Sequence, residues 1–187
     1  MTALVTTAFE LQKKLDAMGL PSAVIGGLAY LAWGEPRLTK DVDLAVLTAL
    51  TDEDEKIDQL LTLVSSRIAD PQAFARLNRV ILGQTKAGVG VDIGLAAFDY
   101  EVGAIERAVD HDYGQDMVLR VIRAEDLIVQ KAFASRDQDW LDIRWVLIRQ
   151  EGKLDWSIVN DNLPALVELK EEPEILTRLQ ALRDELC

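Results

Sequence analysis

Two aspartates separated by one residue are the first feature of this sequence that suggests chemistry. Asp41 and Asp43 begin the alternating segment DVDLAVL. If this segment is a β-strand, both side chains project from one face, with Cα atoms about 6 to 7 Å apart. Aspartate is disfavoured in strands. We therefore expect a chemical reason for two carboxylates at the start of this one.

A third aspartate, Asp92, lies between apolar residues in the segment VGVDIGL. We predict that this segment is the second arm of an antiparallel hairpin. Three carboxylates in one half-buried place repel one another and raise each other's pKa unless a cation neutralises them. Hard oxygen ligands without histidine or cysteine nearby favour Mg²⁺ or Mn²⁺ over Zn²⁺. The three aspartates therefore predict a divalent metal site.

A glycine pair, Gly26-Gly27, stands before a short apolar segment that we predict to be a helix over residues 28–33. Backbone N–H groups of such a turn approach a phosphate closely, and the helix dipole favours its negative charge. Mg²⁺ typically takes several of its ligands from substrate phosphates and water. The glycines and the aspartates together predict a phosphorylated substrate bound beside a metal.

Composition and charge narrow the class of protein. The 187 residues are 49% hydrophobic and carry a formal charge of -12. Residues 1–96 hold 9 Lys+Arg against 12 Asp+Glu, and residues 97–187 hold 11 against 20. A length of this order suits one well-buried domain, or one domain with a helical appendage. The acidic balance disfavours a broad, nonspecific nucleic-acid binder.

The single histidine and the single cysteine exclude other chemistries. His111 is predicted to lie in a polar loop, and Cys187 is the last residue. One residue of each type cannot build a zinc cluster, an internal disulfide or a histidine-based triad. Because no apolar run approaches the roughly 18 to 20 residues of a membrane span, we expect a cytoplasmic protein without membrane contact.

Apolar periodicity predicts the elements that position these residues. In the first two thirds of the chain we expect helices over 3–18, 28–33 and 52–67 (the last capped by Thr51), and strands over 21–25, 41–47, the hairpin 79–98 and 118–122. The remainder reads as helices over 124–136, 138–150, 155–169 and 173–186. The expected fold class is α+β, a small mixed sheet with flanking helices. We expect a core over 1–122 and a helical region over 123–187 packed on it as one compact unit.

The combination of these motifs resembles a known family. The glycine pair, the aspartate pair and the later Asp92 resemble the signature of the DNA polymerase β-like nucleotidyltransferase superfamily. Within it, GEPRLTKDVD followed by EDLIVQKAFASRDQDWLDI is most similar to small bacterial nucleotidyltransferases related to abortive-infection toxins (AbiEii-like). The resemblance covers residues 24–146. It implies a nucleotidyltransferase fold that binds a nucleoside triphosphate with Mg²⁺ or Mn²⁺ and transfers a nucleotidyl group to an acceptor.

The resemblance also implies roles for individual residues of the first half of the chain. Asp41 and Asp43 match the metal-binding pair, and Asp92 matches the third carboxylate, which can act as a base toward the acceptor hydroxyl. Gly26 and Gly27 match the phosphate-binding turn. Many relatives have serine at the second of these positions, so a hydroxyl toward the triphosphate is missing here.

Further matches lie before the aspartate pair and in the C-terminal half. Arg37 and Thr39 match the loop before the pair, and Lys131 matches a helical lysine that can face the triphosphate. Arg136, Asp139 and Asp142 match a helix motif without an assigned role, and Gln138 stands where relatives commonly have lysine. We interpret Asp139 and Asp142 as residues of salt bridges or of the first helical turn.

Three functions remain open at this stage. The first is transfer of a nucleotide to an RNA end, such as that of a tRNA, by a toxin-like enzyme whose partner would be an antitoxin protein. Its RNA contacts would be few, at Arg37, Lys40, Lys131 and Arg136. The second is transfer to a small molecule, as in antibiotic resistance. The third is a catalytically weak, toxin-like module held by its antitoxin.

Overall fold

The computed structural model describes residues 2–186 and divides them into two compact units. We call the first the sheet unit; it comprises the described residues up to Leu28 together with Leu38–Ile122. The second, the helical unit, comprises Ala29–Arg37 and the described residues from Arg123 onward. Cys187 lies outside the described residues.

A mixed sheet forms the centre of the sheet unit. Its strands are β1 (Ser22–Val24), β2 (Asp41–Leu47), β3 (Ser65–Ser66), β4 (Val80–Gln84), β5 (Gly90–Ala96), β6 (Val109–Asp112) and β7 (Val118–Val121). The strand order is β3-β4-β5-β2-β1-β7-β6. The pairs β2–β5 and β1–β7 are parallel and the other pairs are antiparallel. The expected α+β class and the expected hairpin of β4 and β5 are confirmed.

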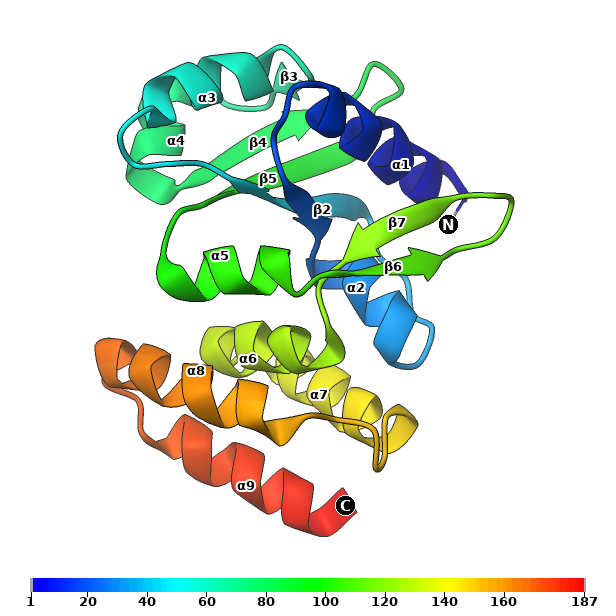
Figure 1. The fold of residues 1–187 in the computed structure, drawn as a ribbon, viewed down its shortest axis with the longest axis vertical. Helices are drawn as coiled ribbons and strands as arrows, with labels where there is room; N and C mark the ends of the chain where they lie inside the picture. The colour runs from blue at the N-terminus through cyan, green and yellow to red at the C-terminus, as the bar shows by residue number, and fades with distance from the viewer. Residues whose placement is uncertain (1, 187) are drawn as a thin grey trace. The chain divides into compact units, whose positions relative to one another are not determined.

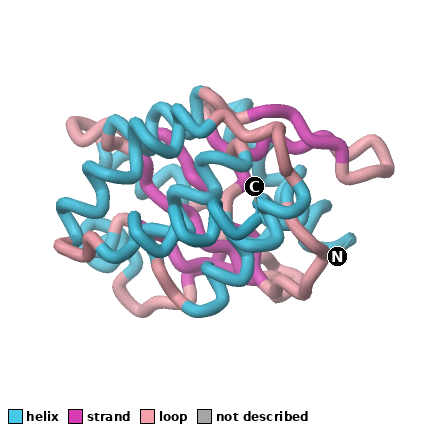
Figure 2. Tube along the Cα trace, turned by 90° about the horizontal axis from the view of Figure 1, so that it is seen from below, coloured by secondary structure: helices cyan, strands magenta, loops and turns pink. Residues whose placement is uncertain are grey.

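Helices accompany this sheet within the same unit. They are α1 (Thr2–Ala17), the first turn of α2 (Gly26–Trp33), α3 (Glu53–Leu61), α4 (Pro71–Asn78) and α5 (Asp99–Glu106). Both α1 and α5 contact β2, whereas α3 and α4 contact β4. In two views the β6–β7 hairpin extends beyond the other strands and ends in its loop (Figure 1 and Figure 2).

Strand alternation separates a buried face of the sheet from a half-open one. On β2, Val42, Leu44 and Val46 are fully buried, whereas Asp41 and Asp43, which alternate with them, are partly exposed. The strand β5 repeats this pattern, with alternate apolar residues buried. Burial of a Val or Leu side chain contributes about 1.5 to 3 kcal/mol. The apolar face therefore holds both strands in place while the polar face stays accessible.

The helical unit consists of the end of α2 and four further helices. These are α6 (Ala124–Ala134), α7 (Asp137–Arg149), α8 (Trp156–Lys170) and α9 (Glu174–Leu186). The helix α6 contacts the three others, and its Leu127 and Ile128 are fully buried (Figure 1). The four C-terminal helices expected from apolar periodicity are confirmed, with ends that differ by at most two residues.

The helix expected over 52–67 is wrong at its C-terminal end. It begins at Glu53, one residue after the expected start, and it ends at Leu61. Ser65–Ser66 instead form β3, which pairs with β4. An edge strand of two residues has no periodicity of its own, so only its partner strand reveals it.

Other short elements also differ from the expectation. His111, expected in a loop, lies in β6 opposite Leu119 of β7. The helices α4 and α5 were not predicted, although Asp70 before Pro71 is a recognisable start signal, and the Asp70 side chain accepts a hydrogen bond from the N–H of Ala73. Within residues 2–186, every helix is too short or too polar to cross a bilayer.

Candidate functional site

The register of β2 and β5 brings the aspartates together. In this parallel pair Asp43 lies opposite Asp92, and Asp41 lies opposite Gly90. Neighbouring strands are about 4.8 Å apart, and residues in register share a face. Asp41, Asp43 and Asp92 are all partly exposed on that face. The structure therefore places the three carboxylates that the sequence singled out on one half-open surface.

Glycines keep the surface around these carboxylates clear. Gly90 and Gly94 flank Asp92 on the same face of β5. A Cβ atom at Gly90 would lie 1.9 Å from Oδ1 of Asp41, so no other residue fits there without moving that carboxylate. At Gly94 the nearest atom to an added Cβ is the carbonyl oxygen of Leu44, at 3.7 Å. A Cβ atom at Gly90 would thus displace the carboxylate of Asp41, whereas one at Gly94 would meet only ordinary contacts.

The first turn of α2 is built around Asp43. The backbone N–H of Ile25 donates to the carbonyl of Asp43 at 3.0 Å, and the N–H of Gly27 donates to Oδ2 of its side chain at 3.2 Å. Gly26 has φ of +57°, and a Cβ atom on it would lie 2.3 Å from the same oxygen. The helix α2 begins at Gly26, two residues before the start that the sequence predicted. The positive end of its dipole lies against Asp43.

Thr39 explains why the second glycine is not a serine. A Cβ atom on Gly27 would lie 2.1 Å from Oγ1 of Thr39. The threonine side chain thus occupies the space that a side chain at position 27 would need. Many members of the family that the sequence resembles have serine at this position. Here the hydroxyl of Thr39 lies beside the same helical turn instead.

One arginine that the sequence did not single out contacts the site. Arg67 forms an ion pair with Oδ1 of Asp92, and both side chains are about one third exposed, at 33% and 31%. Burial raises the pKa of Asp92 above its ordinary value, Arg67 lowers it in part, and the charge of Asp41 raises it further. The described residues include no ion pair to Asp41. Arg67 therefore neutralises part of the carboxylate charge on this face, at Asp92.

The donor set fits a hard divalent ion only in part. No group of three acidic, histidine or cysteine side chains in the described part of the chain is arranged to hold a metal. Asp41 and Asp43 nevertheless offer carboxylate oxygens from one strand, and Mg²⁺ commonly uses only one or two protein carboxylates. The third carboxylate, Asp92, is engaged by Arg67. The aspartate pair is therefore compatible with the ion, whereas Asp92 could bind it only after releasing Arg67.

Arg37 and Lys131 lie in the helical unit, where both bind Asp142. Arg37 contacts this carboxylate through Nε and Nη2 at 2.8 and 2.6 Å. Nζ of Lys131 lies 2.6 Å from Oδ2 of Asp142 and 3.1 Å from Oδ1 of Asp139. Gln138 donates to Asp142 at 2.8 Å. We call these five residues the helical charge cluster.

Buried charges in this cluster are closely compensated. The side chain of Asp142 is 1% exposed and that of Lys131 is 9% exposed. Burial by itself would raise the pKa of Asp142, but hydrogen bonds from Arg37, Lys131 and Gln138 outweigh it and lower the pKa below its ordinary value. The interpretation of Asp139 and Asp142 as salt-bridge residues is confirmed. The two basic residues that the resemblance assigned to the nucleotide are both committed to carboxylates here.

The sequence reasoning missed Gly90 and Arg67 for different reasons. Gly90 precedes Asp92 by two residues, so it shares the strand face with Asp92, and this spacing was a usable signal. Arg67 is 25 residues from Asp92 in the sequence, and no local pattern links the two.

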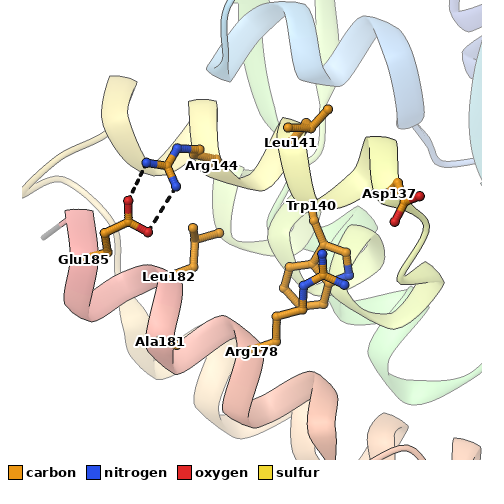
Figure 3. Close-up of a pocket in the computed structure, with 8 residues that line it drawn as sticks. All are labelled: Asp137, Trp140, Leu141, Arg144, Arg178, Ala181, Leu182 and Glu185. Carbon is orange, nitrogen blue, oxygen red and sulfur yellow. Dashed lines mark hydrogen bonds and ion pairs between the residues drawn. The ribbon is translucent and has the colours of Figure 1, made fainter.

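A separate cavity of about 490 Å³ lies between α7 and α9 of the helical unit (Figure 3). The guanidinium of Arg178 stacks on Trp140 with its carbon 4.4 Å from the ring centroid, and Arg144 pairs with Glu185 across the opening. Its lining charges are thus engaged with one another or with the ring, apart from Asp137 at the edge. This arrangement offers packing between the helices but no convergent set of reactive groups.

Comparisons with known proteins agree on one type of fold. The sequence matches the model of a family described as "Nucleotidyl transferase of unknown function (DUF2204)" over residues 5–181. A search of the curated proteins found no match. An antigenic nucleotidyltransferase-like protein from Paracoccidioides brasiliensis is similar in structure, with a TM-score of 0.52 and 20% identity over 95% of this chain and 92% of that one. The antibiotic-resistance factor ANT(2'')-Ia, solved with adenylyl-2''-tobramycin, has a TM-score of 0.51 and 16% identity over 100% of both chains.

Proposed function

We propose a reaction for this chain on the premise that the chain belongs to the family of nucleotidyl transferases of unknown function (DUF2204). The reaction is transfer of a nucleoside monophosphate from a nucleoside triphosphate to an acceptor hydroxyl. The observation that carries the proposal is the register that sets Asp43 of β2 opposite Asp92 of β5, with Asp41 on the same face. Like charges on neighbouring strands repel each other. A sheet with a purely structural role would therefore avoid this arrangement of carboxylates.

The binding of the triphosphate follows from the geometry around α2. Asp41 and Asp43 would hold Mg²⁺ or Mn²⁺, which when bound neutralises charge on the phosphates and on the leaving pyrophosphate. The N–H of Gly27 already points at Asp43. An anion at the start of α2 and a cation on Asp43 would therefore be neighbours, as a triphosphate with its metal requires. Thr39 adds a hydroxyl beside the same turn.

Asp92 is the group that we assign to the acceptor. Its carboxylate would take the proton of the acceptor hydroxyl while the oxygen forms a bond to the α-phosphorus and the bond to pyrophosphate breaks. The pKa of Asp92 lies above its ordinary value because of burial, and this makes Asp92 a better proton acceptor than a solvated aspartate. Its half-open position leaves room for the acceptor.

For the acceptor itself, we favour a small hydroxyl compound over an RNA end. An RNA end requires cations that are free to contact phosphates. Arg37 and Lys131 are engaged by Asp142, and of the four residues named for RNA contacts only Lys40 has no ion pair among the described residues. ANT(2'')-Ia, a protein of the same fold, is solved with an adenylylated small molecule. The AbiEii-like toxin role, the RNA end and the antitoxin partner remain predictions.

The test is transfer of label from nucleoside triphosphates. Purified protein is incubated with each triphosphate labelled at the α- or γ-phosphate, with Mg²⁺ or Mn²⁺, and with either a metabolite fraction or tRNA. We expect α-label, and no γ-label, to appear in a small acceptor, and chelation of the metal to abolish this. Transfer of γ-label or the absence of transfer from every triphosphate would overturn the proposal. Label on tRNA would replace the small acceptor by the RNA end.

A further inference from the structure

Arg67 is held one strand away from Asp92 by its own backbone. The N–H of Arg67 donates to the carbonyl of Leu82 at 2.9 Å, and Leu82 of β4 lies opposite Asp92 of β5. Because residues in register share a face, the arginine side chain reaches Asp92 by crossing a single strand. Arg67, Leu82, Asp92 and Asp43 thus form one line across the sheet. The arginine is placed by the fold, not by chance contact of a long side chain.

The ion pair between Arg67 and Asp92 is open to exchange. Both side chains are about one third exposed. Ion pairs in contact with solvent contribute little to stability, so separating this one costs little. The pairs of the helical charge cluster differ, because Asp142 is 1% exposed and has three partners. Of these two carboxylates, Asp92 is the one that can change partners more readily.

A metal ion and the Arg67 guanidinium would compete at this place. Asp92 is bound by Arg67, and its neighbour Asp43 belongs to the aspartate pair to which we assign the metal. Two cations on adjacent carboxylates repel each other by an energy that falls only with distance and with solvent screening. A divalent ion that uses Asp92 must therefore first displace the guanidinium.

We propose that Arg67 is a displaceable counterion of Asp92. It neutralises this carboxylate while no nucleotide is bound, weakens binding of a divalent ion to the empty site, and releases Asp92 when triphosphate arrives. The triphosphate supplies anionic oxygens both for the metal and for the displaced guanidinium, so metal and nucleotide bind together better than either binds alone. Arg67 is a positioning residue in this scheme. The inference rests on the proposed function and deepens it.

The test measures Mn²⁺ binding to the full chain without nucleotide, by electron paramagnetic resonance of free Mn²⁺. The variants are Arg67→Gln and, as matched control, Arg76→Gln, which removes the same charge from an exposed pair with Asp54 in the same unit. We expect Arg67→Gln to bind Mn²⁺ about tenfold more tightly than the parent protein, and the control to change less than about twofold. Arg67→Lys, which retains the charge, should lie between them.

A double variant assigns the gain to Asp92. In Arg67→Gln combined with Asp92→Asn, the added affinity should disappear. Equal Mn²⁺ affinity in Arg67→Gln and Arg76→Gln, or a gain that persists without Asp92, would overturn the inference. The same titration with a nonhydrolysable triphosphate separates the two proposals. If the parent protein binds no Mn²⁺ in the presence of this triphosphate, the proposed function is overturned. If the parent protein does bind Mn²⁺ under this condition, the variants test only the role of Arg67.

Discussion

Asp92 of the sheet unit and Asp142 of the helical unit are both aspartates with arginine partners, yet their surroundings act in opposite directions. Asp142 is buried and accepts hydrogen bonds from Arg37, Lys131 and Gln138, which lower its pKa. Asp92 is half-buried and has one arginine, and its pKa is raised by burial and by Asp41. Asp142 is surrounded by hydrogen-bond donors, whereas Asp92 is paired with a single arginine.

The difference separates a structural charge from one that we propose to be functional. A buried carboxylate without compensation would cost several kcal/mol, so the helical charge cluster surrounds Asp142 with donors and thereby joins α6, α7 and the segment before β2. At Asp92 the condition is the opposite: burial and the charge of Asp41 raise its pKa, and an added cation would counter both effects. Charge balance, more than residue type, distinguishes the two.

Loss of an aspartate from the sheet site should have the largest effect. Asp43→Asn removes a proposed metal ligand, and we expect nucleotidyl transfer to fall by at least about a thousandfold, because several kcal/mol of transition-state stabilisation are lost. The fold should persist, and its stability without metal should be unchanged or slightly higher, since repulsion is relieved. Rates are measured with α-labelled triphosphate. The exposed Asp58→Asn is the control, and a fully active Asp43→Asn would refute the site.

Loss of Asp142 should instead affect stability. Asp142→Asn removes the charge of the buried carboxylate that Arg37 and Lys131 both contact, and we expect the free energy of unfolding to fall by about 3 to 5 kcal/mol. Urea unfolding at neutral pH measures this. Asp137→Asn, an exposed aspartate of the same helix, should change the value by less than about 1 kcal/mol. A loss for Asp142→Asn no greater than for Asp137→Asn would show that the cluster does not hold the helical unit together.

Two glycines of β5 provide a finer comparison within the sheet site. The Cβ atom in Gly90→Ala would overlap the carboxylate of Asp41, whereas Gly94→Ala meets only ordinary contacts. We expect Gly90→Ala to weaken Mg²⁺-dependent triphosphate binding about 10- to 100-fold, by moving a proposed ligand. Gly94→Ala should bind as the parent does. Calorimetry decides between them, and equal affinities would mean that Asp41 does not contribute to binding.

The smallest effects should appear in the pH dependence of stability, with opposite signs. The pKa of Asp142 is lowered on folding, so its stabilisation is present above the ordinary carboxyl range and is lost as pH falls through the lowered pKa. The pKa of Asp92 is raised on folding, so stability declines as pH rises from the ordinary value through the raised one. For the partly exposed Asp92 we expect about 1 kcal/mol or less.

Urea unfolding of Asp92→Asn and Asp142→Asn across the acidic range tests these signs. Relative to the parent, the free energy of unfolding of Asp92→Asn should rise with pH, and that of Asp142→Asn should fall with pH. Parallel curves for the two variants would contradict the contrast between the two carboxylates.

Local patterns in the sequence were sufficient for the repeating elements and for the aspartates. The alternation of β2 and β5 and the helical spacing of α6 to α9 could be read directly, because the periods of strands and helices act over a few neighbouring residues. The same period placed Asp41 and Asp43 on one face. Short elements such as β3 and β6 escaped because a few residues carry no period.

Tertiary structure alone decided the partners of these residues. Arg37 and Asp142 are 105 residues apart in the sequence, and Arg67 and Asp92 are 25 apart. An ion pair depends on the distance between side chains after folding, and charged residues of the chain offer many alternative pairings that differ little in local pattern. The sequence therefore determined which carboxylates lie together on a strand face, whereas only the folded chain determined which basic residues pair with them.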